Sequence, residues 1–225
     1  TPEYIELKFG RFGVPTVKHQ LIITNNARTA IHTSTPPMIF YTDTPTVSSM
    51  VTNLYTIPQD SMHDAPKVGH LLSIEVLRDR IIPQVLGVTL DAAATKNRGQ
   101  ALELLVAQHI GYMPGEKDLL AAGYPDIRNQ ALEVKVQDSP TVDLGRMSPQ
   151  FQVEVTSCPG FTTEDIRYFI ALTDEKTAVI QGVVLCPGFH LGTHFSYVSD
   201  SNYKCQRSIS MSFFDRYDGQ AVFNP

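Results

Sequence analysis

The residues best suited to chemistry in this sequence are two carboxylates and a lysine near its middle. Asp126 comes first, and Glu133 and Lys135 follow with one residue between them. Side chains two positions apart share one face of a β-strand, so a strand over residues 131–136 would place Glu133 and Lys135 together. The opposite face of that strand would carry the apolar side chains of Leu132, Val134 and Val136. The pattern therefore predicts one chemical face and one core face.

A short turn would bring the earlier carboxylate to the same place. Asn129 and Gln130 lie between Asp126 and the predicted strand, and Asn suits the backbone of a tight hairpin turn. Paired carboxylate oxygens bind a hard cation such as Mg²⁺, and a nearby ammonium can hold an attacking water. Metal-assisted phosphodiester hydrolysis requires this combination of groups. The alternative is an ordinary surface hairpin on which Glu133 and Lys135 are solvated.

The spacing of Pro125-Asp126 and Glu133-Val134-Lys135 resembles the motif of the PD-(D/E)XK nuclease superfamily, which includes most type II restriction endonucleases. The gap between the two halves is at the short end for that family, so the hairpin must be tight. The resemblance directly covers about residues 97–137. It implies an α/β fold, bordering on α+β, in which helices flank a mixed central β-sheet as in a restriction-endonuclease core.

For function, the resemblance implies a Mg²⁺-dependent endonuclease that cuts double-stranded DNA. A sequence-specific type II restriction enzyme is the favoured form, and a homodimer would present one site to each strand. Asp126 and Glu133 would bind the metal with the backbone carbonyl of Val134, and Lys135 would position the water. The alternatives are a structure-selective repair or recombination nuclease of the same superfamily and a DNA-binding module without catalysis.

A further carboxylate precedes the motif on a predicted helix over residues 96–109. Several families of the superfamily carry a glutamate four residues after a glycine on this helix, and the pair Gly99 and Glu103 has that form. The resemblance thus implies that Glu103 is a further metal ligand, directly or through water. The alternative is a glutamate on the solvated face of an amphipathic helix.

Contacts with DNA are expected from basic and amide side chains outside the metal site. The candidates are Lys96, Arg98, Arg146, Lys204, Gln206 and Arg207. A solvated polar surface is the alternative for each of them. The net charge of −5 counts against DNA binding, although a local basic face can coexist with an acidic total.

The composition is that of an ordinary globular protein. With 225 residues, of which 42% are apolar and 18% charged, the chain can bury a substantial core. We expect one domain, with residues 1–65 as a β-rich N-terminal elaboration and a catalytic core over about residues 66–190. Because the chain has neither an apolar run of membrane-spanning length nor a signal-peptide pattern, we expect a cytoplasmic protein with no membrane partner.

The cysteines and histidines offer a rival metal site. Cys186, His190, His194 and Cys205 are ligand types that zinc accepts, but their spacing matches no common structural zinc pattern. Unrelated loop residues and free thiols are the alternative. Together with Cys158, the chain has three cysteines, which cannot all pair within one molecule.

Hydrophobic periodicity places further elements around the motif. A helix is expected over residues 71–81, ended or kinked by Pro83, before the helix over residues 96–109. Asn25-Asn26 predicts a turn near the start of the chain, and residues 138–149 predict a loop. The predicted strands cover residues 4–9, 20–24, 38–41, 131–136, 151–155, 168–172, 178–185 and 208–214.

Overall fold

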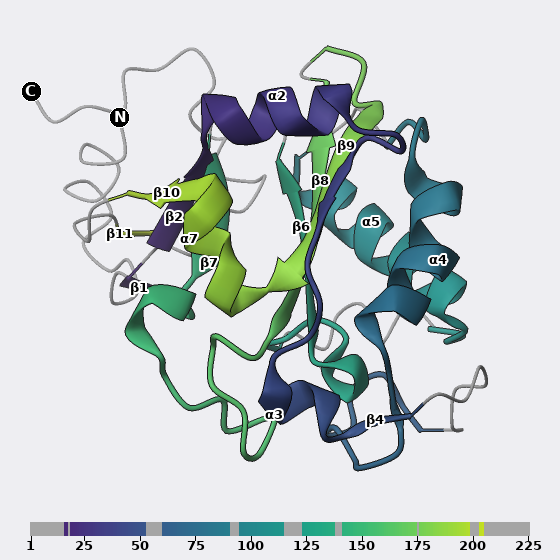
Figure 1. The fold of residues 1–225 in the computed structure, drawn as a ribbon, viewed down its shortest axis with the longest axis vertical. Helices are drawn as coiled ribbons and strands as arrows, with labels where there is room; N and C mark the ends of the chain where they lie inside the picture. The colour runs from purple at the N-terminus through teal and green to yellow at the C-terminus, as the bar shows by residue number, and fades with distance from the viewer. Residues whose placement is uncertain are drawn as a thin grey trace, which may run out of the picture.

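A four-stranded mixed β-sheet forms the centre of the molecule, with strand order β3-β9-β8-β6 (Figure 1). The computed structural model describes residues 16–17, 19–52, 60–90, 95–114, 123–137, 141–174, 176–198 and 203–204. The strands of the central sheet are β3 (Met38–Phe40), β9 (Ile180–Pro187), β8 (Arg167–Thr173) and β6 (Leu132–Gln137). β6 runs parallel to β8, β8 antiparallel to β9, and β3 parallel to β9.

Other strands form smaller sheets. Strands β10 (Phe195–Tyr197), β2 (His19–Ile23) and β7 (Thr141–Gly145) make an antiparallel sheet with β2 in the middle. Two short pairs complete the described strands, namely β1 (Thr16–Val17) with β11 (Tyr203–Lys204) and β4 (Val51–Thr52) with β5 (Leu71–Leu72).

Helices lie on both sides of the central sheet. The α-helices are α2 (Asn25–Thr33), α3 (Pro45–Ser48), α4 (Ile74–Val85), α5 (Thr95–Ile110) and α7 (Leu191–His194). Short 3₁₀ segments cover Arg128–Gln130, Pro149–Phe151 and Gly188–His190. The predicted mixed α/β content is confirmed. Among the described helices, none has the length and apolar character that crossing a membrane requires.

The two faces of the central sheet pack into different cores. On β8, Phe169 and Ala171 join the core beneath α4 and α5, whereas Tyr168 and Ile170 join the core shared with α2 and β2. Burial on both faces explains why β8 and β9 read as nearly continuous apolar runs. Figure 1 shows α4 and α5 on one side of the sheet and α2 with the β10-β2-β7 sheet on the other.

Helix α4 begins later and ends later than its apolar spacing predicts. The preceding residues Leu71 and Leu72 pair with β4, and the Ser73 side chain then caps the helix by accepting the Val76 N–H. Pro83 does not end the helix but lies exposed in its last turn, with two helical residues after it.

Several predictions about local structure are wrong. Asn25 and Asn26 start α2 rather than a turn, since the Thr24 hydroxyl accepts the Ala27 N–H and caps a helix there. Residues 151–155 are not a strand, because Gln152 has a left-handed backbone with φ of 50° and Glu154 makes only an isolated bridge to Thr162.

The predicted loop over residues 138–149 contains strand β7. The predicted strands over residues 4–9 and 208–214 lie outside the described residues. The division of one domain near residue 65 stays a prediction, although residues 1–65 carry the helices α2 and α3 as well as strands.

Candidate active site

A four-residue turn joins Asp126 to strand β6. Ile127 and Leu132 exchange backbone hydrogen bonds of 2.9 and 3.1 Å, and a 3₁₀ segment with Ala131 in the left-handed region lies between them. The predicted two-residue turn at Asn129-Gln130 is therefore wrong in form. The consequence for Asp126 is the same, because the paired ends of the turn return it to the side of the strand.

The two carboxylates are fixed by reciprocal contacts with the backbone. The Asp126 N–H donates to Glu133 Oε2 over 3.0 Å, and the Val134 N–H donates to Asp126 Oδ2 over 2.9 Å. Each carboxylate thus accepts a hydrogen bond from a backbone N–H in the segment that carries the other carboxylate. This arrangement leaves little freedom in the separation of the two side chains.

The Lys135 ammonium lies among three oxygen atoms. It forms an ion pair with Glu133 Oε1, lies 3.3 Å from Asp126 Oδ2 and donates to the Val134 carbonyl over 3.2 Å. The same three groups are the metal ligands that the resemblance to the nuclease superfamily implies. Leu132 and Val134 pack into the core under α5, whereas Glu133 and Lys135 contact each other, as the two-residue period of the strand predicts.

Burial governs the charges in this site. Glu133 is only 4% exposed, and burial, followed by repulsion from Asp126, raises the pKa of its carboxyl group. Burial by itself would lower the pKa of Lys135, but attraction to Asp126 and Glu133 outweighs it and raises the pKa above its ordinary value. The amine is therefore an ammonium at neutral pH.

Glu103 extends the site from helix α5. Burial raises the pKa of its carboxyl group to about 7, with a further contribution from the negative charge of Asp126 and an opposing one from Lys135. The α5 helix packs directly against β6. Glu103 thus belongs to the electrostatic environment of the Asp126, Glu133 and Lys135 side chains.

The oxygen atoms around Lys135 are of a type that could hold a divalent cation. Two carboxylates and a carbonyl are hard oxygen ligands of the type that Mg²⁺ binds. All three groups lie close to one positive charge, the Lys135 ammonium. Among the described residues, no group of three or more His, Cys, Asp or Glu side chains could hold a metal ion, so a metal here depends on the Val134 carbonyl as third ligand.

Among the described residues, Cys186, His190 and His194 do not form a group that could hold a metal ion. Cys186 is buried on β9, whereas His190 stacks on Tyr41 with ring centres 4.1 Å apart. A hydrogen bond of 3.0 Å joins His194 Nε2 to the Tyr41 hydroxyl. Cys205 lies outside the described residues. The two imidazoles therefore contact an aromatic side chain in the part of the chain that is described.

The predicted DNA contacts are spread over several elements. Arg98 is half-buried on α5, and Arg146 is exposed directly after β7. Lys96 lies on α5 and Lys204 on β11, but their side chains are outside the described part, as are the predicted contacts Gln206 and Arg207. A role in DNA binding stays a prediction for all six residues.

Two tyrosines near Glu133 were not singled out from the sequence. Tyr168 lies opposite Glu133 in the β6–β8 register, and its hydroxyl is 2.6 Å from that of Tyr124. Burial raises the pKa of both phenols, which keeps them protonated beside the acid. Tyr124 directly precedes Pro125-Asp126, and this position in the sequence could have indicated that Tyr124 lies near the site.

No protein-family model, curated protein or solved structure matches this chain. The chemistry of the site rests on its own geometry. Two carboxylates, one carbonyl and one ammonium meet at a single point, with a third carboxylate of raised pKa on the adjacent helix. Groups of these types could hold a divalent cation with a water or a phosphate oxygen beside it.

Proposed function

We propose that this chain is a Mg²⁺-dependent endonuclease that hydrolyses phosphodiester bonds of double-stranded DNA. The observation that carries the proposal is the convergence of Asp126, Glu133 and the Val134 carbonyl on the Lys135 ammonium. A surface hairpin with a solvated Glu and Lys does not account for it, because Glu133 is 4% exposed. Burying the Glu133 carboxylate beside Asp126 is costly, and ionisable groups perturbed in this way occur preferentially at functional sites.

Each side chain has a distinct part in this mechanism. A Mg²⁺ ion at the site would supply Lewis-acid stabilisation of the phosphate and acidify a bound water. Asp126, Glu133 and the Val134 carbonyl would hold the ion. Lys135 would orient the attacking water or a phosphate oxygen, since its ammonium offers three donors and stays protonated.

The fold is compatible with the superfamily that the motif resembles. That resemblance implies a mixed sheet flanked by helices, and here α4 and α5 pack beside one face of a mixed four-stranded sheet. Within the superfamily we favour a type II restriction endonuclease that acts as a homodimer. The β10-β2-β7 sheet adds structure beyond the core and could serve recognition or dimer formation.

Incubation with supercoiled plasmid and Mg²⁺ tests the proposal, with chelator as the blank. Discrete fragments would support restriction, cutting limited to branched DNA would support a structure-selective nuclease, and intact metal binding without cutting would indicate a noncatalytic module. Asp126→Ala and Lys135→Ala should each abolish cleavage. Lys176→Ala removes an exposed lysine beside an acidic turn and should leave cleavage unchanged. Activity retained in both site variants would refute the assignment.

A further inference from the structure

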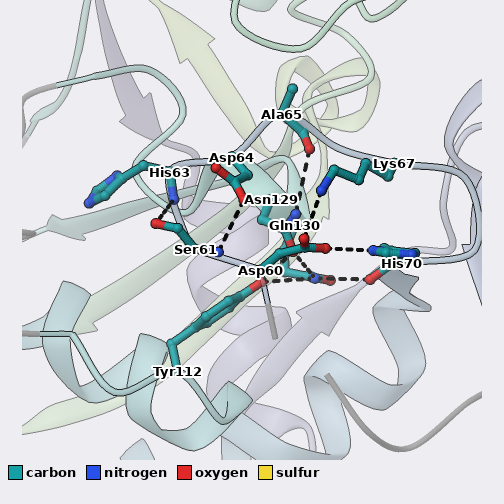
Figure 2. Close-up of polar contacts among 10 residues, drawn as sticks. All are labelled: Asp60, Ser61, His63, Asp64, Ala65, Lys67, His70, Tyr112, Asn129 and Gln130. Carbon is teal, nitrogen blue, oxygen red and sulfur yellow. Dashed lines mark hydrogen bonds and ion pairs between the residues drawn. The ribbon is translucent and has the colours of Figure 1, made fainter. Parts of the chain in front are cut away.

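Two amide side chains in the turn of the candidate active site are completely buried. Asn129 and Gln130 have no exposed surface, although turns usually carry polar residues toward solvent. A buried amide is costly unless its donors and acceptors are satisfied. Figure 2 shows that these amides are bonded to groups from two other segments of the chain.

Tyr112 connects the two amides to helix α5. Its hydroxyl donates to Asn129 Oδ1 over 2.7 Å and accepts from Gln130 Nε2 over 3.0 Å, and Gln130 Nε2 also lies 3.2 Å from Asn129 Oδ1. Tyr112 follows the end of α5 and is 7% exposed. One hydroxyl group thus ties the turn to the helix that carries Glu103.

The segment from Asp60 to Leu72 holds the turn from another side. The Leu72 N–H donates to Gln130 Oε1 over 2.9 Å, and the Asn129 N–H donates to the Met62 carbonyl over 3.0 Å. Asp60 braces this segment, with one carboxylate oxygen 2.7 Å from Lys67 Nζ and the other 2.5 Å from His70 Nδ1 (Figure 2). The turn is therefore bonded to a segment with its own internal support.

The backbone of the turn contains one residue in an unfavourable conformation. Ala131 has φ of 48°, in the left-handed region that a residue with a Cβ adopts only at a cost. Arg167 holds the turn from the sheet side, where its N–H donates to the Ala131 carbonyl over 2.8 Å and its guanidinium to the Gln130 carbonyl over 3.2 Å. A conformation imposed by surrounding contacts is a mark of pre-organisation.

We propose that Tyr112, Asn129 and Gln130 are positioning residues for the metal-binding carboxylates. Asp126 and Glu133 lie on either side of the turn, so the conformation of the turn sets the distance between them. The inference rests on the proposed function and deepens it. The three residues contact neither carboxylate in the described hydrogen bonds and act through the shape of the turn.

The substitution Tyr112→Phe tests the inference, because it removes only the shared hydroxyl. Calorimetric titration with Mn²⁺ measures cation binding without DNA, and Asp126→Asn identifies the binding that belongs to this site. We expect the dissociation constant for Mn²⁺ to rise about tenfold, as is typical when support of metal ligands is lost. Asp60→Asn weakens the contacts of Asp60 with Lys67 and His70 in the supporting segment. It should raise the dissociation constant for Mn²⁺ less than Tyr112→Phe does.

Ser34→Ala is the matched control for a purely structural effect. The Ser34 hydroxyl also makes several hydrogen bonds, including one to the Ile31 carbonyl of 2.9 Å and one from the Met38 N–H of 2.9 Å, but it lies in the connection between α2 and β3. It should lower the melting temperature and leave Mn²⁺ binding unchanged. Unchanged binding in both Tyr112→Phe and Asp60→Asn would overturn the inference.

The same titration separates this inference from the nuclease proposal. If the unmodified protein binds Mn²⁺ at Asp126 but cuts no DNA, the nuclease proposal fails, while weaker binding by Tyr112→Phe still supports positioning. If the protein binds no Mn²⁺ that depends on Asp126, both proposals are refuted. Should Tyr112→Phe fail to fold, Asp60→Asn decides by its own change in the dissociation constant.

Discussion

Replacing Lys135 by methionine should lower the free energy of unfolding, because the candidate active site loses its positive charge. The side chain keeps its length, but Glu133 and Asp126 lose the cation they share. Removing one partner of a buried ion pair costs about 3–5 kcal/mol. Because the Lys135 side chain is 21% exposed, we expect the lower end, about 3 kcal/mol. In a chain of this size, that loss lowers the melting temperature by about 6–12 °C.

The loss of stability in Lys135→Met should grow as the pH rises. A carboxyl group whose folded pKa is raised stabilises the fold below its unfolded pKa, and this contribution disappears as the pH rises through the folded pKa. Without Lys135, the pKa of Glu133 rises further, because Lys135 is what lowers it in the unmodified protein. Lys135→Met should therefore cost less at about pH 5 than at about pH 9, because a larger share of Glu133 is protonated at the lower pH.

Scanning calorimetry in chelator at both pH values measures the effect, followed by addition of Mg²⁺. A divalent cation should raise the melting temperature of Lys135→Met more than that of the unmodified protein, because it replaces the missing charge. Lys67→Met is the control, since Lys67 forms an ion pair with Asp60 of similar chemistry but is 51% exposed. A loss no larger than that of Lys67→Met would refute the reasoning.

Three further substitutions probe Glu103 and the packing of two glycines. Glu103→Gln should flatten the fall in stability between about pH 5 and pH 8, because the wild-type carboxyl, with a pKa of about 7, destabilises the fold as it ionises. Urea unfolding should show about 1–2 kcal/mol in favour of the variant at the higher pH, after allowance for solvent screening; an unchanged pH profile would contradict this. Gly182→Ala should cost about 1–3 kcal/mol, since its Cβ would collide with Ile31 of α2. By contrast, Gly99→Ala meets open space on α5 and should stabilise by up to about 1 kcal/mol. Equal effects at the two glycines would contradict the packing of α2 on β9.

The sequence predicts the elements whose hydrophobic pattern is long or continuous. Strands β8 and β9 and helix α5 were found for that reason, and the two-residue period of β6 placed Glu133 beside Lys135. Helix α2 was missed because its residues are mostly polar and its start depends on the Thr24 cap. The Asn25-Asn26 pair also favours a turn, so the local sequence did not indicate that Thr24 caps a helix there.

Local sequence patterns could not predict the contacts that hold the turn of the site in place. Asn129 and Gln130 suit a solvated turn by type, and only their partners at Met62, Leu72 and Tyr112 make them interior residues. Those partners are distant in sequence and have no spacing rule that links them to the motif. Identity and spacing could therefore predict which groups meet, but not what holds them at a fixed separation.

The pairing of distant strands has a consequence for how the chain folds during synthesis. In the central sheet Met38 pairs with Val183, and in the smaller sheet β2 lies between β7 and β10, so that Ile23 pairs with Phe195. Contacts between segments so far apart slow folding, because the chain must close a long loop before any contact forms. Because β2 and β3 come early in the sequence, these apolar strands leave the ribosome well before β9 and β10 are made. During that interval their apolar side chains and backbone edges lack the strands that cover them in the fold, and segments exposed in this way are prone to aggregation.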